Sequence, residues 1–262
     1  MAHVFDPLKP AKALFSAWQS GELHDSLPQA LRPQSLDQGY AIQDELFKLA
    51  GGERAGWKLG VGSPAAMRAG NLSRPLVGQL ESKRCHKSGA QVRLPAQSPV
   101  TIECEIGFVL ARTVSPRVGG TFAPEDIRST CLTFEVVRSR FVDRKSVGWP
   151  SFAGDNVGFE ALIIGHPACD SIDPQILRSL AEESVVHLDG EPVAKGLFGD
   201  TATDPLASLQ HLYDHAAERG ETLREGDIVS TGAMCQPFDL QTGGHRLSVS
   251  YLGRELGFTL GL

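Results

Sequence analysis

The run from Val100 to Leu110 constrains the fold more than any other segment, because it is apolar except for a few positions that include Glu103 and Glu105. Side chains on a strand alternate between its two faces. The pattern therefore predicts a strand with one apolar face and with both carboxylates on the other. Two half-buried carboxylates repel each other, and burial without a partner raises their pKa. A divalent cation held by oxygen ligands would offset this cost, which indicates an enzyme.

Helical spacing dominates the first 55 residues. Apolar residues recur every three or four positions within Lys9–Gln19. Ser35-Leu-Asp-Gln38 has the form of a capping box and predicts the start of a second helix. Gly51-Gly52 predicts its end. We expect these helices to form an N-terminal portion of the fold.

From residue 56 onward, short apolar segments alternate with turn residues, which favours a mostly antiparallel β body. Asp189-Gly190 has the composition of a hairpin turn. A helix from about Asp204 to Glu218 interrupts the strands, and Gly220 would end it. The simplest organisation is one α+β domain over 1–262, with a helical portion (1–55) and a β-rich catalytic body (56–262). The predicted strands are Trp57–Val61, Val77–Leu80, Ile102–Leu110, Thr133–Val137, Ala161–Ile164, Ser184–Leu188, Ile228–Ser230, Leu247–Tyr251 and Leu256–Leu260.

Charge and cysteine content narrow the class of protein. A net charge of -6 argues against general nucleic-acid binding, which needs a basic face, and leaves room for an anionic substrate. The five cysteines include no CxxC pair, so a structural zinc site is not expected. Their odd number and the absence of signal-peptide features predict a cytoplasmic protein. No stretch has the roughly 18 to 20 apolar residues of a membrane span.

Two further residues extend the candidate site. Glu135 lies in another alternating segment, and Lys58 interrupts the short apolar run from Gly56 to Gly60. Three carboxylates would suit Mg²⁺ or Mn²⁺ better than Zn²⁺, but an ordinary surface or salt-bridged glutamate fits the pattern at Glu135 as well. Lys58 is either a snorkelling edge residue or a partly buried acid or base with its pKa lowered near a metal.

These motifs occur in the order found in a known group of enzymes. The set resembles 2-keto-4-pentenoate hydratase, 2-oxohept-3-enedioate hydratase and 4-oxalocrotonate decarboxylase, within the fumarylacetoacetate hydrolase superfamily, over nearly the whole chain. The resemblance implies a mixed β-sandwich roll with a helical N-terminal portion. The motifs are Gly56-Trp-Lys58-Leu-Gly60, Glu103-x-Glu105, Glu135-Val-Val-x-Ser-Arg140, Asp155-Asn156 and Gly226-Asp-Ile-Val-Ser-Thr-Gly232.

The resemblance also implies a chemistry. It implies Mg²⁺ or Mn²⁺ on Glu103, Glu105 and Glu135, with Lys58 as the proton-transfer residue. Substrates of the group are 2-oxo acids or their dienols from aromatic ring cleavage, so we expect a hydratase that ketonises a 2-hydroxy-2,4-dienoate and adds water. The alternatives are a 2-oxo acid decarboxylase of the 4-oxalocrotonate type and a non-catalytic partner subunit. A homo-oligomer is implied, and a complex with a pathway neighbour is open.

Five more residues are candidates for substrate binding: Ser63, Arg140, Asp155, Asn156 and Thr231. The Ser63 hydroxyl could bind a carboxylate. Arg140 is open to two roles, a contact with the substrate carboxylate or a salt bridge to an aspartate such as Asp155. The resemblance places Asp155 and Asn156 near the metal. Thr231 lies in a glycine-containing turn that offers a hydroxyl and N–H groups to an anion, although a plain loop fits equally.

Two other motifs have ordinary explanations. Gly60-Val-Gly-Ser-Pro-Ala65 matches a dinucleotide-binding pattern, but the chain lacks regular βαβ alternation. Ser63 followed by Pro64 predicts a common helix start. His211 and His215 are four apart on a helix without a third ligand nearby, so we expect solvated or capping side chains.

The chain departs from its resembling enzymes around the pocket. Arg74-Pro-Leu-Val-Gly-Gln-Leu80 lacks the acidic residue that often precedes this segment in those enzymes, and Gly154-Asp-Asn-Val-Gly158 lacks a small hydroxyl residue. If the missing acid positions water, its loss weighs against hydration. The metal and lysine motifs are kept, which predicts a shared metal-dependent step with an unusual substrate or a changed outcome.

Overall fold

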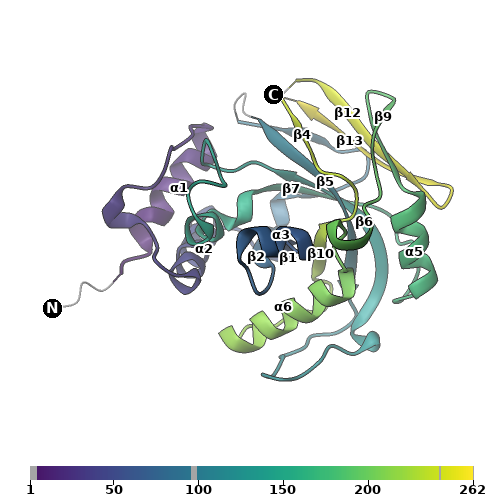
Figure 1. Ribbon diagram of the computed structural model, residues 1–262, viewed down its shortest axis with the longest axis horizontal. Coiled ribbons are helices and arrows are strands. Elements are labelled where there is room, and N and C mark those ends of the chain that lie inside the picture. The colour runs from purple at the N-terminus through teal and green to yellow at the C-terminus, as the bar shows by residue number, and fades with distance from the viewer. Residues whose placement is uncertain (1–4, 96–98, 242, 262) are drawn as a thin grey trace.

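The computed structural model describes residues 5–95, 99–241 and 243–261. Two β-sheets form its body, and the helices lie around them (Figure 1). The strands are β1 (Arg54–Gly60), β2 (Leu76–Glu81), β3 (Cys85–Lys87), β4 (Gln91–Arg93), β5 (Val100–Leu110), β6 (Ile127–Val137), β7 (Phe159–Ile164), β8 (Val185–Leu188), β9 (Glu191–Lys195), β10 (Ile228–Ala233), β11 (Phe238–Leu240), β12 (His245–Tyr251) and β13 (Arg254–Gly261).

The larger sheet has the strand order β2-β1-β10-β5-β6-β7-β3, with β11 also paired to β5. The smaller sheet has the order β4-β13-β12-β8-β9. Most neighbouring strands are antiparallel, as expected, but β1–β10, β3–β7 and β4–β13 are parallel, so both sheets are mixed. The α+β class predicted from the sequence is confirmed.

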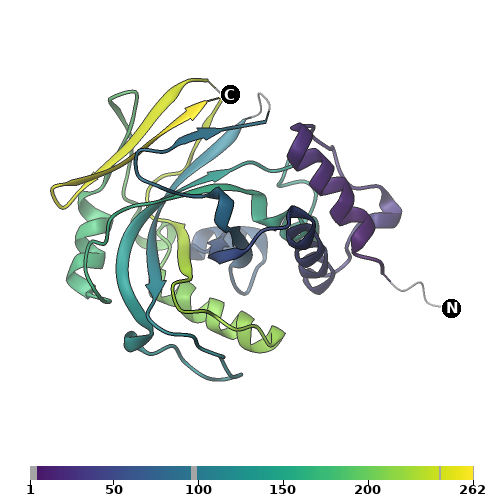
Figure 2. The ribbon, with the colours of Figure 1, turned by 180° about the vertical axis from the view of Figure 1, so that it is seen from behind.

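Helices cover the sheets at several places. Figures 1 and 2 show α1 and α2 together on one side of the molecule, with β12 and β13 on the opposite side. No helix in the described part of the chain has the length and apolar character needed to cross a membrane. The helices are α1 (Leu8–Ser20), α2 (Leu36–Ala50), α3 (Pro64–Gly70), α4 (Trp149–Gly154), α5 (Pro174–Glu183) and α6 (Pro205–Arg219).

Local capping explains where the predicted helices begin and end. The Ser35 hydroxyl accepts a hydrogen bond from the Gln38 backbone N–H at the start of α2, and Gly51 ends that helix in the left-handed region at φ 65°. Ser63 caps α3 in the same way, with Pro64 as its first residue. Asp204 caps α6. These helix boundaries agree with the sequence prediction to within a few residues.

The long strand β5 has the two faces that its sequence predicts. Its apolar residues, including Ile102 and Phe108, are buried in the main hydrophobic cluster, which also contains side chains of the smaller sheet. Phe134 on β6 meets Phe258 on β13 with ring centroids 5.4 Å apart. The apolar face of β5 therefore packs between the two sheets. Its carboxylates lie on the opposite face.

Some elements carry no clear sequence signal. The strands β3, β4 and β11 have three residues each, which is too short for alternation to be recognised. His215 was expected at the surface, but it is buried against Tyr40 and Trp57, with ring centroids 4.7 and 6.5 Å away. Burial lowers its pKa to about 3. That prediction was wrong because the face of α6 that packs on the sheet is wider than its leucine stripe.

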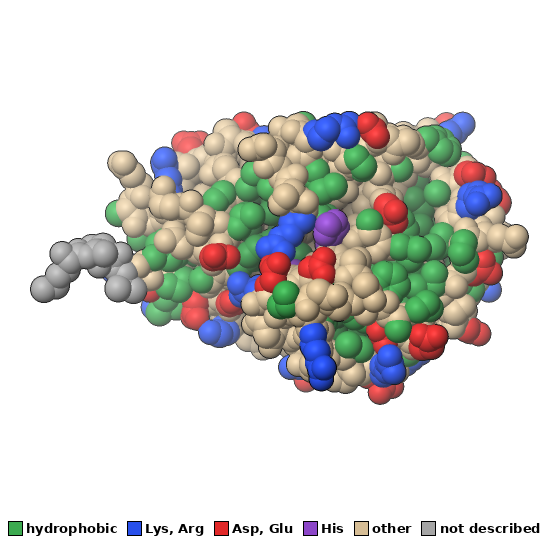
Figure 3. All heavy atoms as spheres, turned by 60° about the horizontal axis from the view of Figure 1, so that its bottom comes forward, with side chains coloured by type: hydrophobic (Ala, Val, Ile, Leu, Met, Phe, Trp, Pro, Cys, Tyr) green, Lys and Arg blue, Asp and Glu red, His purple; other side chains and the backbone are tan. Residues whose placement is uncertain are grey.

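Acidic and basic side chains are interspersed on the face shown in Figure 3. Exposed ion pairs such as Arg68–Asp200 and Arg246–Glu255 have the same mixed character. Interspersed charges of both signs largely cancel beyond a Debye length, so they produce no extended field of one sign.

Candidate metal centre

The carboxylates of Glu103, Glu105 and Glu135 come together on one face of the larger sheet. One oxygen of each lies within 4.8 Å of the others. The register explains this, since Glu103 and Glu135 are directly opposite each other on antiparallel β5 and β6, and Glu105 follows on the same face. Glu105 and Glu135 are fully buried, and Glu103 is half-buried. The sequence could not show whether Glu135 lies near Glu103 and Glu105, and in the structure it does.

Burial makes ionisation of this cluster costly. It raises the pKa of Glu135 to about 7, with Lys58 acting against the rise and Glu103 adding to it. It also raises the pKa of Glu105 well above its usual range, with repulsion from Glu135 and Glu103 as further causes. Burial therefore favours the protonated form of both acids unless a cation compensates their charge.

Hydrogen bonds satisfy only part of the cluster. Glu105 Oε2 accepts from the Ser230 hydroxyl at 2.6 Å and from the Gly232 N–H at 2.8 Å. Its Oε1 and the Glu135 oxygens are buried without a well-formed hydrogen bond among the described residues. Such atoms are rare in proteins and call for an explanation. Carboxylate oxygens are the ligands that hard divalent cations prefer, so this set fits one.

Lys58 lies beside the acids. Its position on β1 pairs it with Ser230 on β10, which places both on the face that carries the glutamates. Its Nζ is 2.9 Å from Glu135 Oε1 and donates to the Val157 carbonyl at 3.2 Å. With 1% of its surface exposed, it is a buried lysine and does not snorkel at a sheet edge. Gly78 makes room for it, since a Cβ there would lie 2.7 Å from Lys58 Cδ.

A strained turn aims the Val157 carbonyl at Lys58. Asn156 and Val157 both have left-handed backbone, at φ 50° and 52°, which is unfavourable for a β-branched residue. Strain of this kind persists only where neighbouring contacts impose it. The Asn156 side chain supplies such contacts by accepting from the Gln79 N–H and donating to the Gln79 carbonyl, each at 2.8 Å.

A buried ion pair holds the same turn from its other side. Arg140 Nε donates to Asp155 Oδ1 at 2.5 Å, and the Ser139 hydroxyl donates to Oδ2 at 2.8 Å. The guanidinium carbon lies 4.8 Å from the centre of the Trp18 ring. Arg140 and Asp155 are fully buried. The salt bridge left open by the sequence is therefore present, and these two side chains are occupied by each other.

A cavity of about 680 Å³ opens beside the glutamates. Of the residues singled out in the sequence, Lys58, Ser63 and Glu103 line it. Ser63 also caps α3, accepting from the Ala66 N–H at 3.2 Å. The candidate substrate-binding residues Arg140, Asp155, Asn156 and Thr231 are not among the lining residues. These four side chains instead form hydrogen bonds with other parts of the protein. The Thr231 hydroxyl, for example, donates to the Ile106 carbonyl at 2.7 Å.

Several residues of the site escaped the sequence analysis. Ser230 orients Glu105, and its hydroxyl lies 2.6 Å from that of Thr133. Arg144 and Lys145 line the cavity from the loop between β6 and α4. A serine in a strand and a basic pair in a loop are common features, so neither carries a signal of function. Only the pairing of distant segments reveals their positions.

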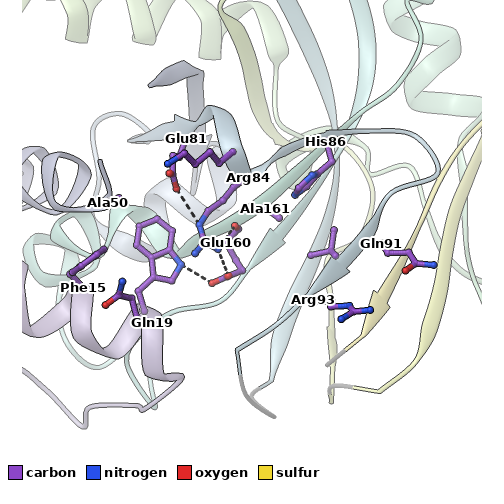
Figure 4. Close-up of a pocket in the computed structure, with 13 residues that line it drawn as sticks. Phe15, Gln19, Ala50, Glu81, Arg84, His86, Gln91, Arg93, Glu160 and Ala161 are labelled. Carbon is purple, nitrogen blue, oxygen red and sulfur yellow. Dashed lines mark hydrogen bonds and ion pairs between the residues drawn. The ribbon is translucent and has the colours of Figure 1, made fainter. Parts of the chain in front are cut away.

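A second cavity of about 380 Å³ lies between α1 and the edge of the larger sheet (Figure 4). Its acids are already paired, because Arg84 lies 3.2 Å from Glu81 Oε2 and 2.5 Å from Glu160 Oε1. Trp18 Nε1 donates to the other Glu160 oxygen at 2.9 Å. Carboxylates whose oxygens already have ion-pair or hydrogen-bond partners are poor metal ligands. This cavity is therefore a weaker candidate for a metal centre than the glutamate cluster.

The chain is similar in sequence and in structure to known proteins. Residues 62–254 match the family model described as fumarylacetoacetate (FAA) hydrolase C-terminal. A 2-keto-4-pentenoate hydratase of Burkholderia vietnamiensis is 29% identical over 204 residues, 74% of each chain. A 4-oxalocrotonate decarboxylase of Pseudomonas putida is 29% identical over 220 residues, covering 82% of this chain and 81% of the relative. The solved 4-oxalocrotonate decarboxylase from Pseudomonas putida G7, complexed with magnesium and adipate, has a TM-score of 0.81 at 22% identity over 97% of each chain.

Proposed function

The chain belongs to the fumarylacetoacetate hydrolase family, and from that premise we propose that it is a divalent-metal-dependent hydratase acting on a 2-hydroxy-2,4-dienoate. One observation carries the proposal. Three glutamates from two paired strands lie next to a buried lysine at the wall of a large cavity, and the buried Glu105 Oε1 and Glu135 Oε2 have no partner among the described residues. Relatives named 2-keto-4-pentenoate hydratase support this reaction.

Glu103, Glu105 and Glu135 would hold the cation through their facing oxygens. The similar decarboxylase structures are complexed with magnesium or calcium, which supports a hard cation, and we propose Mg²⁺ or Mn²⁺. When bound, the cation supplies Lewis acidity toward the keto oxygen and carboxylate of a 2-oxo acid. Ser230 keeps Glu105 Oε2 engaged, which leaves Oε1 as its free ligand atom.

Lys58 carries the protons in this scheme. Ketonisation moves a proton from the 2-hydroxyl to carbon 5, and hydration then places the hydroxyl of water on carbon 4 and a proton on carbon 3. The Lys58 ammonium is oriented for such transfers by Glu135 on one side and by the Val157 carbonyl on the other. Asn156 and the Arg140–Asp155 pair act through this carbonyl, as positioning residues.

The cavity wall would favour the hydrocarbon part of the substrate. Trp149, Phe152 and Val157 contribute apolar surface next to the polar floor. Apolar walls with a few placed polar groups are typical of small-molecule sites. Exclusion of bulk water by this wall would strengthen the electrostatic interactions of Lys58 and the carboxylates with the substrate.

The test follows the loss of dienol absorbance by the purified chain with and without Mg²⁺. We expect turnover only with the metal, and we expect Glu105→Gln to abolish Mg²⁺ binding in calorimetry while circular dichroism stays unchanged. Equal turnover after chelation would refute the proposal. A folded, metal-binding but inactive chain would favour the partner-subunit alternative.

Decarboxylation is the second candidate. Glu103 is the only acid among the described residues that line the cavity, so no second carboxylate is available there to position water. Arg74, which stands near the place of the expected acid, pairs with Glu218 at 2.6 Å. Release of CO₂ from 4-oxalocrotonate by the same preparation, without hydration of a dienol, would select this reaction over hydration.

A further inference from the structure

Two cations line the cavity apart from Lys58. Arg144 is half-buried, with its guanidinium carbon 5.9 Å from the centre of the Phe152 ring, and Lys145 is exposed. Neither forms an ion pair within the described part of the chain, whereas Arg68 and Arg74 pair with carboxylates. The adjacent Asp143 accepts from the Lys145 backbone N–H at 2.9 Å. The cavity therefore has two cationic groups that are not paired with a carboxylate of the described residues.

Exposure separates these cations from Lys58. The buried Lys58 marks the floor of the cavity, where the lining residue Glu103 connects it to the fully buried Glu105 and Glu135, while the half-buried Arg144 and the exposed Lys145 mark its mouth. Apolar residues such as Val137 and Trp149 line the space as well. This arrangement suits a ligand with a polar group at each end and hydrocarbon between them.

The charges of the cavity indicate what that ligand carries. Three ionised glutamates contribute -3, Lys58 contributes +1 and a dication would contribute +2, so the floor becomes neutral. Arg144 and Lys145 then leave a charge of +2 at the cavity. A dianion would neutralise it, whereas a monocarboxylate would leave the mouth without a partner.

We propose that Arg144 and Lys145 bind the distal carboxylate of a dicarboxylic substrate, so that this chain prefers dicarboxylic 2-oxo acids and their dienols to monocarboxylic ones. The inference rests on the proposed metal site, which binds the 2-oxo acid end. It assigns the substrate class and is independent of whether hydration or decarboxylation follows.

The experiment compares 2-oxoadipate with 2-oxohexanoate, two unreactive 2-oxo acids of equal chain length that differ in the distal carboxylate. Calorimetry with the Mg²⁺-loaded protein should give 2-oxoadipate an affinity about 10-fold higher. In Arg144→Gln/Lys145→Gln the preference should fall to about one, with 2-oxohexanoate affinity unchanged within about twofold. In roughly 1 M NaCl, where the Debye length is about 3 Å, the wild-type preference should shrink.

A control variant, Lys12→Gln/Arg117→Gln, removes the same charge at exposed positions that do not line the cavity and should keep the preference. Because the mouth residues are at least partly exposed, thermal unfolding should give wild-type midpoints for both variants. Equal affinities in the wild type, or a preference that survives in the mouth variant, would overturn the inference. Failure of both ligands to bind in an Mg²⁺-dependent manner would instead refute the proposed metal site.

Discussion

Replacing Glu135 by glutamine should stabilise the metal-free protein at alkaline pH. Burial raises the pKa of Glu135 from 4.5 to about 7. Below pH 4.5 the carboxyl is protonated in the folded and unfolded states. Between pH 4.5 and 7 the folded state binds more protons, so stability falls as pH rises through this window. A difference of about 2.5 pH units at about 1.4 kcal/mol each corresponds to about 3.5 kcal/mol.

Glutamine resembles the protonated carboxyl and carries no such penalty. In a chelating buffer, Glu135→Gln should therefore unfold with a free energy up to about 3.5 kcal/mol above that of the wild type at pH 8 and close to it at pH 4. Urea unfolding of both proteins across this range measures the difference. The exposed Glu22→Gln serves as the control and should show no pH-dependent difference.

Magnesium should reverse the order. Ligation of the ionised carboxylate by the cation stabilises the folded wild type, by about 4.1 kcal/mol at roughly 1,000 times the dissociation constant, which exceeds the difference without metal. The variant should gain much less, because it lacks one ligand. A variant that is less stable than the wild type at pH 8 without metal would refute the argument that burial, opposed by Lys58, dominates the energy of this carboxylate.

Three other substitutions test neighbouring parts of the structure. Lys58→Ala should keep Mg²⁺ affinity in calorimetry but lose exchange of the substrate C5 proton in NMR, and undiminished exchange would exclude Lys58 as the proton carrier. Gly78→Ala places a Cβ 2.7 Å from Lys58 Cδ, so turnover should fall about 10-fold for a displacement costing about 1.4 kcal/mol, while Mg²⁺ affinity stays unchanged. Burial lowers the pKa of His215 from 6.5 to about 3, so the unfolded state binds the extra proton as pH falls below 6.5. The wild type should lose up to about 2 kcal/mol between pH 7 and pH 5, a loss that urea unfolding of His215→Phe should lack.

Local patterns in the sequence predicted much of this fold. The period of two in Val100–Leu110 put Glu103 and Glu105 on one face, and packing of the other face against the smaller sheet confirms it. The caps at Ser35 and Ser63 were recognisable because a capping contact spans only a few residues. Short strands without alternation, such as β3, were missed.

The composition of the site came partly from the sequence and partly from the resemblance to a family. Residue types and their order identified Lys58 and the three glutamates as candidates. The same reasoning could not tell that Arg140 and Asp155 bind each other, because they are 15 positions apart along the chain, with α4 between them. A polar residue in a sequence does not reveal whether its partner is a ligand or another side chain.

The sequence alone determined where apolar and polar residues alternate, where helices are capped and which residue types are available. These features depend on neighbours within about one helical turn or one strand. Only the tertiary structure decided the register that sets Glu103 opposite Glu135 and the order of strands that brings Lys58 next to Ser230. It also decided which polar groups line the cavity, as Arg144 does, and which are paired with other groups in the protein interior. The physical reason is that pairing between segments far apart in the chain depends on the packing of the whole core, which no local window contains.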